Sequence, residues 1–288
     1  MINKRLDLSL EAQKFFGLPD DPFSRAPRSR EEVYIPAELQ RVIDKVIEAI
    51  RFQHFIAITG EIGSGKSTLR ALIEDYVFSN PKLHIVWPEF YDMKNVSPMQ
   101  IAASILDSFG HRPIPPSAIK RGKEVKDLLA MQFKGDNRVA IAFDECHRLN
   151  ASALSSLKNF FEMSSGGFQR YLAVILFGQP VFKVNLAKPQ FREIYERMTV
   201  IEMPEFSQLA EGYLKHRLKL VDVNMKDLFD DDAVALICGQ ATTPLQLGNI
   251  ANEALTISMG LKNKQVIGAA IRTKMFFNNR SQGFRKAA

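Results

Sequence analysis

The sequence has few cysteines and no long apolar run, and both shortages exclude classes of protein. Cys146 and Cys238 are the two cysteines of the chain, too few for a disulfide framework or for a zinc site built from four thiolates. The longest apolar runs, such as Tyr171–Phe177, are far shorter than the roughly 20 residues that span a bilayer. The first residues, Met-Ile-Asn-Lys-Arg-Leu-Asp, lack the apolar stretch of a signal peptide. We therefore expect a cytoplasmic protein without a membrane partner.

Acidic residues are missing from the end of the sequence, and this absence indicates what kind of partner the protein binds. The net charge is +6, and no Asp or Glu follows Glu253. Seven basic residues follow it: Lys262, Lys264, Arg272, Lys274, Arg280, Arg285 and Lys286. A segment with charge of one sign favours a polyanionic partner, most simply nucleic acid, although a solubilising tail would have the same composition.

The 288 residues, 46% hydrophobic and 24% charged, have the composition of a globular protein large enough for an α/β domain with a smaller one appended. Short apolar strands alternate with amphipathic helices up to about residue 204, and only helical patterns follow. This order predicts a parallel sheet flanked by helices and then a small all-helical lid. The expected strands are Phe55–Thr59, His84–Trp87, Val139–Phe143, Tyr171–Phe177 and Thr199–Glu202. The expected helices are Leu39–Ile50, Ser67–Phe78, Pro98–Phe109, Glu124–Phe133, Ser152–Met163, Ser207–Val221, Asp230–Cys238 and Leu245–Met259. The expected organisation is an amino-terminal extension (1–36), the α/β core (37–204), the lid (205–275) and a basic tail (276–288).

A phosphate-binding loop stands between the first expected strand and the next helix. Residues 60–67, Gly-Glu-Ile-Gly-Ser-Gly-Lys-Ser, match the pattern G-x-x-x-x-G-K-[ST] in full. Its glycines let backbone N–H groups turn toward phosphate oxygens, and the helix amino terminus adds favourable partial charge. Lys66 is expected to reach the β- and γ-phosphates of ATP, and Ser67 to ligate Mg²⁺. The expected nucleotide-binding residues are Gly60, Glu61, Ile62, Gly63, Ser64, Gly65, Lys66, Ser67 and Thr68.

An acidic pair follows a later buried strand. Asp144 and Glu145 come directly after Val139–Phe143, and ligands of open α/β sheets bind at such carboxyl ends. We expect Asp144 to act in the Mg²⁺ shell and Glu145 to polarise the attacking water, because a base beside the metal indicates hydrolysis as well as binding.

Four more polar residues are candidates for the site. Gln179 ends the strand after the acidic pair and is expected near the γ-phosphate and the water, although a plain turn before Pro180 fits too. Arg197 is preferred over Arg192 as an arginine that reaches a neighbouring subunit's nucleotide, and a surface charge is the alternative for both. His147 has no metal-binding pattern around it, so it is interpreted as structural or as a contact near the site.

The chain resembles the AAA+ ATPases of the ExeA-like and transposition-associated group, the Mu B, TniB and TnsC type. The resemblance rests on Phe-Phe-Gly-Leu at 15–18 with Pro-Phe at 22–23, on Leu-Phe-Gly-Gln-Pro at 176–180, and on Tyr-Leu-Lys-His-Arg-Leu at 213–218. It covers roughly residues 12 to 275.

The resemblance implies an ATP-dependent homo-oligomer or filament on double-stranded DNA that selects target DNA and recruits or activates a transposase. It also implies that Arg197 acts between subunits. It places DNA contacts after the second strand, at Lys94, and in the connector before the next helix, at Lys120, Arg121 and Lys123. Solvated loop charges are the alternative for each of them.

The sequence departs from the group at one point, and two other functions stay open as alternatives. The lid of the group often carries Gly-x-Pro-Arg, and here the corresponding residues 242–246 are Thr-Thr-Pro-Leu-Gln, without the nucleotide-sensing arginine. An ExeA-type secretion or cell-envelope ATPase is one alternative function, and a replication or helicase-loading ATPase is the other.

Overall fold

The chain divides into two compact units, described one at a time. A computed structural model describes residues 6–24 and 26–272. One unit consists of Ala37–Glu61 and Lys66–Met203. The other takes in Met1–Pro36 and Pro204–Ala288, and the loop residues Ile62–Gly65 are grouped with it. This division groups the described residues before Ala37 with the helices that follow Met203.

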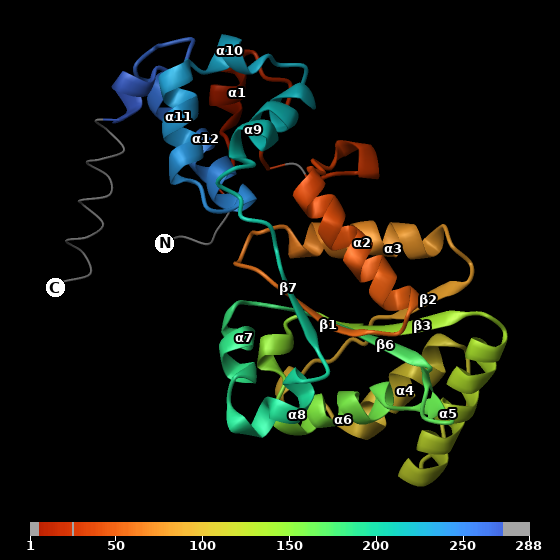
Figure 1. The fold of residues 1–288 in the computed structure, drawn as a ribbon. Coiled ribbons are helices and arrows are strands. Elements are labelled where there is room, and N and C mark those ends of the chain that lie inside the picture. Colours follow the sequence, from red (N-terminus) through yellow and green to blue (C-terminus); the bar gives the residue numbers. More distant parts are fainter. Residues whose placement is uncertain (1–5, 25, 273–288) are drawn as a thin grey trace. The chain divides into compact units, whose positions relative to one another are not determined.

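The first unit is built on a five-stranded sheet in the order β2-β3-β6-β1-β7 (Figure 1). All neighbours pair in parallel. The three central strands are buried along nearly their whole length, which explains their continuous apolar sequence. The strands are β1 (Phe55–Thr59), β2 (Leu83–Val86), β3 (Arg138–Phe143), β6 (Leu172–Gly178) and β7 (Thr199–Glu202), with a separate hairpin of β4 (Ser164–Ser165) and β5 (Gln169–Arg170).

The register brings the predicted site residues to one edge of this sheet. Thr59 of β1 is paired with Gly178 of β6, and Phe143 of β3 with Leu176 of β6. The phosphate-binding loop, the acidic pair and Gln179 follow these three strands and therefore leave the sheet at the same side. The predicted α/β fold with its parallel sheet is confirmed.

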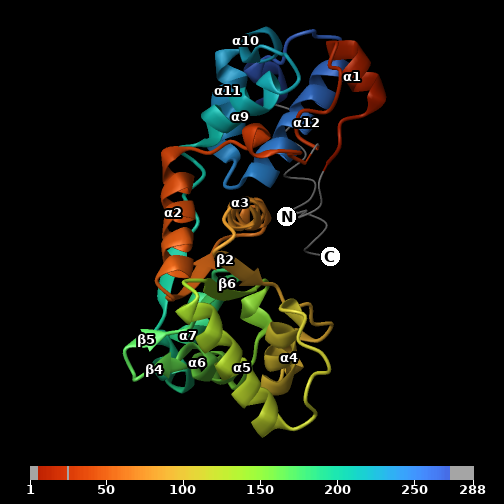
Figure 2. The same ribbon diagram turned by 90° about the vertical axis from the view of Figure 1, so that its right-hand side faces the viewer.

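Helices cover both faces of the sheet. The two views agree that α2 and α3 lie on one face, and α4, α5 and α6 on the other (Figures 1 and 2). Their apolar stripes form the core with the strands; Leu129 of α5 and Leu157 of α6, for example, are fully buried. The helices of this unit are α2 (Ala37–Arg51), α3 (Lys66–Phe78), α4 (Pro98–Ser108), α5 (Ala118–Lys134), α6 (Ala151–Phe161), α7 (Val181–Leu186) and α8 (Arg192–Tyr195).

Helix α5 begins earlier than the sequence pattern predicts. Its first residue is Ala118, so Lys120, Arg121 and Lys123 lie on a helix and not in a connector. Gly122, unfavourable in a helix by about 1 kcal/mol, obscured this start in the sequence. The Arg121 guanidinium donates to the carbonyls of Pro115 and Met99, and these bonds help to hold the first turn.

The second unit is all-helical and includes the amino-terminal segment. Figure 2 shows α1 beside α12, and the two helices are in contact. Ser9 caps α1 at one end, and Gly17 ends it in the left-handed region at φ 70°. Among the described residues, the α-helices of this unit include α1 (Leu10–Phe16), α9 (Ala210–Lys219), α10 (Met225–Leu228), α11 (Asp231–Gln240) and α12 (Pro244–Gly260).

Buried polar bonds tie the amino-terminal segment into the helical unit. The Asp21 carboxylate, 2% exposed, accepts from the backbone N–H groups of Leu8 (2.7 Å) and Phe23 (2.8 Å) and from the Asn252 amide (3.1 Å). Arg217 Nε donates to the Pro22 carbonyl at 2.6 Å. The partners are up to 231 positions apart in sequence, so the packing of residues 6–23 depends on α9 and α12.

Candidate nucleotide-binding site

The loop after β1 has the backbone that phosphate binding requires. Gly63 and Gly65 adopt φ values of 80° and 95°, a region that glycine enters without steric cost. The Gly60 N–H donates to the Gly178 carbonyl at 3.1 Å, which fixes the start of the loop to the end of β6. Helix α3 starts at Lys66, directly after the loop, as the motif predicts.

Lys66 points back at its own loop. Its Nζ donates to the Gly60 carbonyl at 2.7 Å and to the Glu61 carbonyl at 2.8 Å. Burial lowers the pKa of the Lys66 amino group, and the charges of Asp144 and Glu145 oppose this shift. The ammonium group is thus partly desolvated, near both carboxylates, and held by two neutral acceptors that phosphate oxygens could replace.

The oxygen atoms around this loop fit a nucleotide and Mg²⁺. Ser64 Oγ is buried and has no hydrogen-bond partner among the described residues. Buried polar atoms without a partner are rare in folded proteins, and some of them are atoms that bind a ligand. Ser67, an exposed residue, and Asp144 would supply the hydroxyl and carboxylate oxygens that Mg²⁺ prefers.

The acidic pair is held in an unusual backbone conformation. Glu145 lies in the left-handed region at φ 54° and ψ 32°, which for a residue with a side chain costs roughly 1–2 kcal/mol. In this conformation its N–H donates to Asp144 Oδ1 at 2.8 Å. Strain of this kind clusters at functional sites, and no sequence pattern around Glu145 predicts it.

The residues after the acidic pair connect it to β6. His147 Nε2 lies 3.5 Å from Glu145 Oε2, which places the histidine beside the predicted base. Cys146 is fully buried, and burial raises the pKa of its thiol well above the usual range, so the thiol is inert. A Cβ on Gly178 would lie 2.6 Å from Cys146 Sγ. Only glycine therefore allows β6 to approach Cys146 so closely at this position. This close approach sets where Gln179, the next residue, leaves the strand.

A pocket of about 340 Å³ adjoins both carboxylates. Besides Asp144 and Glu145, its wall includes Trp87, Arg70 and Arg148. The Arg70 guanidinium lies 4.1 Å from the centroid of the Trp87 ring, in cation–π geometry. These three residues are not among the sequence-predicted site residues, because no local spacing relates their positions.

The two candidate interface arginines differ in their contacts. Arg197 Nε lies 2.5 Å from Glu162 Oε1, and Nη1 donates to the Glu193 carbonyl at 2.9 Å. Arg192 pairs with Glu196 one turn along α8, at 3.0 Å, and 80% of its side chain is exposed. Arg197 is therefore fixed to the body of the unit, and Arg192 is an exposed side chain on a short helix.

The basic residues considered for DNA contact fall into two groups. Lys94, Lys120 and Lys123 are exposed. Arg121 is half-buried, and its guanidinium is bonded to backbone carbonyls, so its role in the structure is to hold the start of α5. The acid-free carboxy-terminal residues Lys274, Arg280, Arg285 and Lys286, and the expected tail 276–288, lie outside the described residues.

The stretch without the lid arginine has a structural purpose. Thr243 Oγ1 accepts from the Gln246 N–H at 3.2 Å, and Gln246 Oε1 accepts from the Thr242 N–H at 3.1 Å. This reciprocal pattern caps the start of α12, with Pro244 in the first turn. The segment is therefore a helix start whose side chains are occupied with capping.

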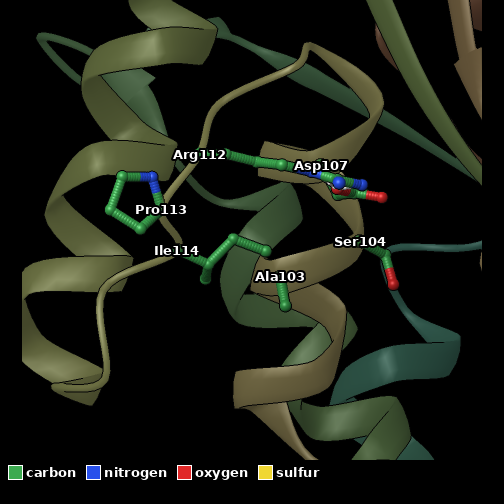
Figure 3. A pocket seen from close by; sticks show the side chains of 6 residues that line it. All are labelled: Ala103, Ser104, Asp107, Arg112, Pro113 and Ile114. Carbon is green, nitrogen blue, oxygen red and sulfur yellow. Dashed lines mark hydrogen bonds and ion pairs between the residues drawn. The ribbon is translucent and has the colours of Figure 1, made fainter.

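A second pocket, of about 790 Å³, has none of the predicted site residues in its lining (Figure 3). Its lining comes from the end of α4 and the following loop, with Ser104 and Ile114 among the lining side chains. Asp107 and Arg112 pair across it, with Arg112 Nε 2.7 Å from Asp107 Oδ1. None of the lining residues is a candidate for phosphate or metal binding.

Comparisons with known proteins agree with this geometry. A model of the AAA domain family matches residues 50–184, from the end of α2 into α7. The chain is 24% identical over 212 residues to general secretion pathway protein A of Aeromonas hydrophila. That alignment covers 72% of this chain and 37% of the relative, so the chain spans little more than a third of the relative's length.

Solved structures with the same fold include three proteins at 16% identity. Cdc6p of Pyrobaculum aerophilum matches with a TM-score of 0.55, over 91% of this chain and 69% of that one. ORC1 of Aeropyrum pernix, solved in complex with DNA, matches at 0.51 over 90% and 68%. A variant of Thermotoga maritima RuvB matches at 0.51 over 87% and 72%. At this identity the likeness shows the fold, and together with the family match it supports an AAA+ ATPase domain. Across the described residues, no helix is both long and apolar enough to cross a membrane.

Proposed function

We propose that this chain is an Mg²⁺-dependent, DNA-binding AAA+ ATPase that assembles as a homo-oligomer on double-stranded DNA and regulates transposition, by selecting target DNA and recruiting or activating a transposase. The main support is that the glycine loop with Lys66 and the pair Asp144 and Glu145 follow strands of one parallel sheet at the same edge. That edge combines a phosphate cradle, oxygen ligands and a base.

The residues of this edge divide the work of ATP hydrolysis. Lys66 would exchange its two carbonyl partners for β- and γ-phosphate oxygens, and loop N–H groups would donate to the phosphates. Ser67 and Asp144 would hold Mg²⁺, which when bound neutralises charge on the phosphate oxygens. Glu145 would accept a proton from the attacking water, and Gln179 would help to position that water.

Assembly supplies the last catalytic group in this proposal. Arg197 would reach the γ-phosphate bound by a neighbouring subunit and stabilise negative charge in the transition state. The resemblance to the transposition-associated group supports this role, and the firm placement of Arg197 agrees with it. The capped Thr242–Gln246 stretch offers no arginine for sensing nucleotide from the lid, which makes hydrolysis more dependent on the assembly.

DNA binding in this proposal depends on charge. Lys94, Lys120 and Lys123 are exposed on the α/β unit and could contact phosphates without reading bases. Arg121 is not part of this surface, because its guanidinium is already bonded. ATP-dependent assembly would multiply the contacts along the DNA and so strengthen binding.

A function in secretion is the second candidate, and one observation favours it. The curated relative found in the comparisons is a general secretion pathway protein A, aligned over 72% of this chain. Replication or helicase loading is a weaker candidate, since the likeness to Cdc6p and ORC1 extends to the fold alone.

The first test measures ATP hydrolysis by the full chain with and without duplex DNA. The proposal predicts stimulation by DNA, and a rate that DNA leaves unchanged would favour the secretion function. The link with transposition is tested by first establishing whether the neighbouring gene encodes a transposase, and then adding that transposase to ATP-bound assemblies on DNA. ATP-dependent retention of the transposase is expected, and its absence would remove the transposition role.

The second test follows DNA affinity across salt concentrations by fluorescence anisotropy. In a Lys120→Ala, Lys123→Ala double variant, the slope of log affinity against log salt should decrease in magnitude by about 0.9 for each phosphate that is no longer neutralised. Lys134→Ala is the matched control, because it removes an exposed charge from the other end of α5. Equal slopes for all three proteins would exclude this part of α5 from DNA binding.

A further inference from the structure

Two ion pairs cross between helix α6 and the segment that contains Arg197. Glu162, at the end of α6, pairs with Arg197 Nε at 2.5 Å. One turn earlier on α6, Lys158 Nζ pairs with Glu193 Oε2 at 2.7 Å. The partners on each side are four residues apart, and the charges are reversed from one pair to the next. The two pairs therefore fix both the position and the direction of the segment 193–197 against α6.

Two contacts orient the guanidinium of Arg197. Nε is engaged by Glu162, and Nη1 by the Glu193 carbonyl. The planar guanidinium has five N–H donors in a fixed fork, so engagement of one side determines the direction in which the other side points.

We propose that Glu162 is a positioning residue for Arg197 and holds its guanidinium oriented toward the nucleotide of a neighbouring subunit. This inference rests on the proposed role of Arg197 between subunits. An arginine that is already oriented loses less conformational freedom when it meets a phosphate, and a displacement of about 1 Å can cost a large factor in rate.

The exposure of the pair excludes the opposite role, in which Glu162 would withhold Arg197 from the neighbouring site. The side chains of Arg197 and Glu162 are 36% and 38% exposed. An ion pair this accessible contributes about 1 kcal/mol or less, which is enough to bias the orientation of the guanidinium and too little to withhold it from a γ-phosphate. Removal of Glu162 should therefore slow hydrolysis, whereas release from an inhibitory contact would accelerate it.

The test compares Glu162→Ala with Glu196→Ala in the full chain. Glu196 is the matched control, because it also forms a glutamate–arginine pair, but with Arg192 instead of Arg197. For Glu162→Ala we expect kcat of the DNA-bound assembly to fall about threefold to fivefold. KM for ATP, ATP-analogue binding by the isolated chain and the melting temperature should not change. Glu196→Ala should retain the wild-type kcat.

A double variant separates the two proposals. If Glu162 acts through Arg197, Glu162→Ala should have no further effect on kcat in the Arg197→Ala background. An equal additional decrease in that background, or a rise in kcat for Glu162→Ala alone, would overturn the positioning role while leaving Arg197 between subunits.

A second measurement does not depend on turnover. Light scattering with the slowly hydrolysed analogue ATPγS would report nucleotide-dependent assembly, and Glu162→Ala should require more protein for half-assembly than the wild type. Because Glu162 acts through Arg197 in this proposal, Glu162→Ala should impair assembly or hydrolysis only if Arg197→Ala impairs them too. Wild-type behaviour of Arg197→Ala in both measurements would instead refute the proposed function of Arg197, and the role of Glu162 with it.

Discussion

Buried polar groups are bonded differently at the carboxyl edge of the sheet and in the helical unit. In the helical unit, Asp21 accepts two backbone N–H groups and one amide, and Arg217 donates to a carbonyl. At the sheet edge, Ser64 Oγ and His147 Nδ1 are buried with no partner among the described residues; in the helical unit the same holds for Asn252 Oδ1. The bonds of Asp21 and Arg217 stabilise the helical unit, whereas Ser64 Oγ and His147 Nδ1 lack partners beside the residues expected to bind nucleotide. Substitutions at the carboxyl edge of the sheet should therefore reduce nucleotide binding or hydrolysis. Substitutions in the helical unit should instead lower the free energy of unfolding.

The largest effect should come from Glu145→Gln. The amide preserves the size of the side chain but cannot accept a proton, so ATP hydrolysis should fall at least about a hundredfold. Nucleotide affinity and melting temperature should stay near those of the wild type. Phosphate release and titration with a fluorescent ATP analogue measure the two properties. Hydrolysis at the wild-type rate would show that another residue is the base.

Lys66→Ala should weaken nucleotide binding about tenfold to a hundredfold, because it removes a charged donor from the phosphates. The same fluorescent titration measures this change. Lys45→Ala, which removes an exposed lysine from α2, is the control and should bind as the wild type does. An unchanged affinity for Lys66→Ala would contradict the phosphate-loop assignment.

Asp21→Ala tests how much the buried polar bonds stabilise the helical unit. It removes the acceptor of the Leu8 and Phe23 N–H groups inside the helical unit, so we expect a decrease of about 1–3 kcal/mol in the free energy of unfolding. Thermal or urea unfolding measures it, with the exposed Asp7→Ala as the control. If both variants unfold together with the wild type, the buried bonds of this unit are not what stabilises it.

The smallest effect concerns pH. Because burial lowers the pKa of Lys66 in the folded chain, the unfolded chain holds more protons between that lowered value and the ordinary 10.5. The stability of the wild type should therefore rise with pH in this alkaline window. Lys66→Met should be more stable than the wild type at neutral pH, and its advantage should shrink as the pH approaches 10.5. Urea midpoints across pH measure the difference in stability between the two proteins. A difference that does not change with pH would show that burial of the Lys66 charge does not lower the stability of the wild type.

Local patterns were sufficient to predict the sheet and to place the phosphate-binding loop and the acidic pair at its carboxyl edge. Continuous apolar runs such as Val139–Phe143 are strands because both faces of the sheet are covered, and parallel pairing then sends the loop and the acidic pair to the same side. These features depend on neighbours in sequence, so one chain contains enough information to predict them.

The remaining features depend on residues distant in sequence. Helix α1 and the segment around it are held by Asn252, more than 200 positions away, and no spacing within residues 6–23 indicates that contact. The start of α5 depends on the bonds of Arg121 to carbonyls, which outweigh the unfavourable Gly122. The left-handed backbone of Glu145 is also set by its surroundings, since an unconstrained glutamate avoids that region.

The contact between Arg70 and Trp87 has an optical consequence. Trp87 is the single tryptophan of the chain, and its ring lies beside the carboxylates in the pocket that Asp144 and Glu145 line. Its neighbours are a guanidinium at 4.1 Å and the Phe177 ring, with centroids 5.7 Å apart. Tryptophan emission from this chain therefore originates at this one place, beside the residues expected to act on ATP. The unlabelled chain carries its own fluorophore beside the candidate nucleotide-binding site.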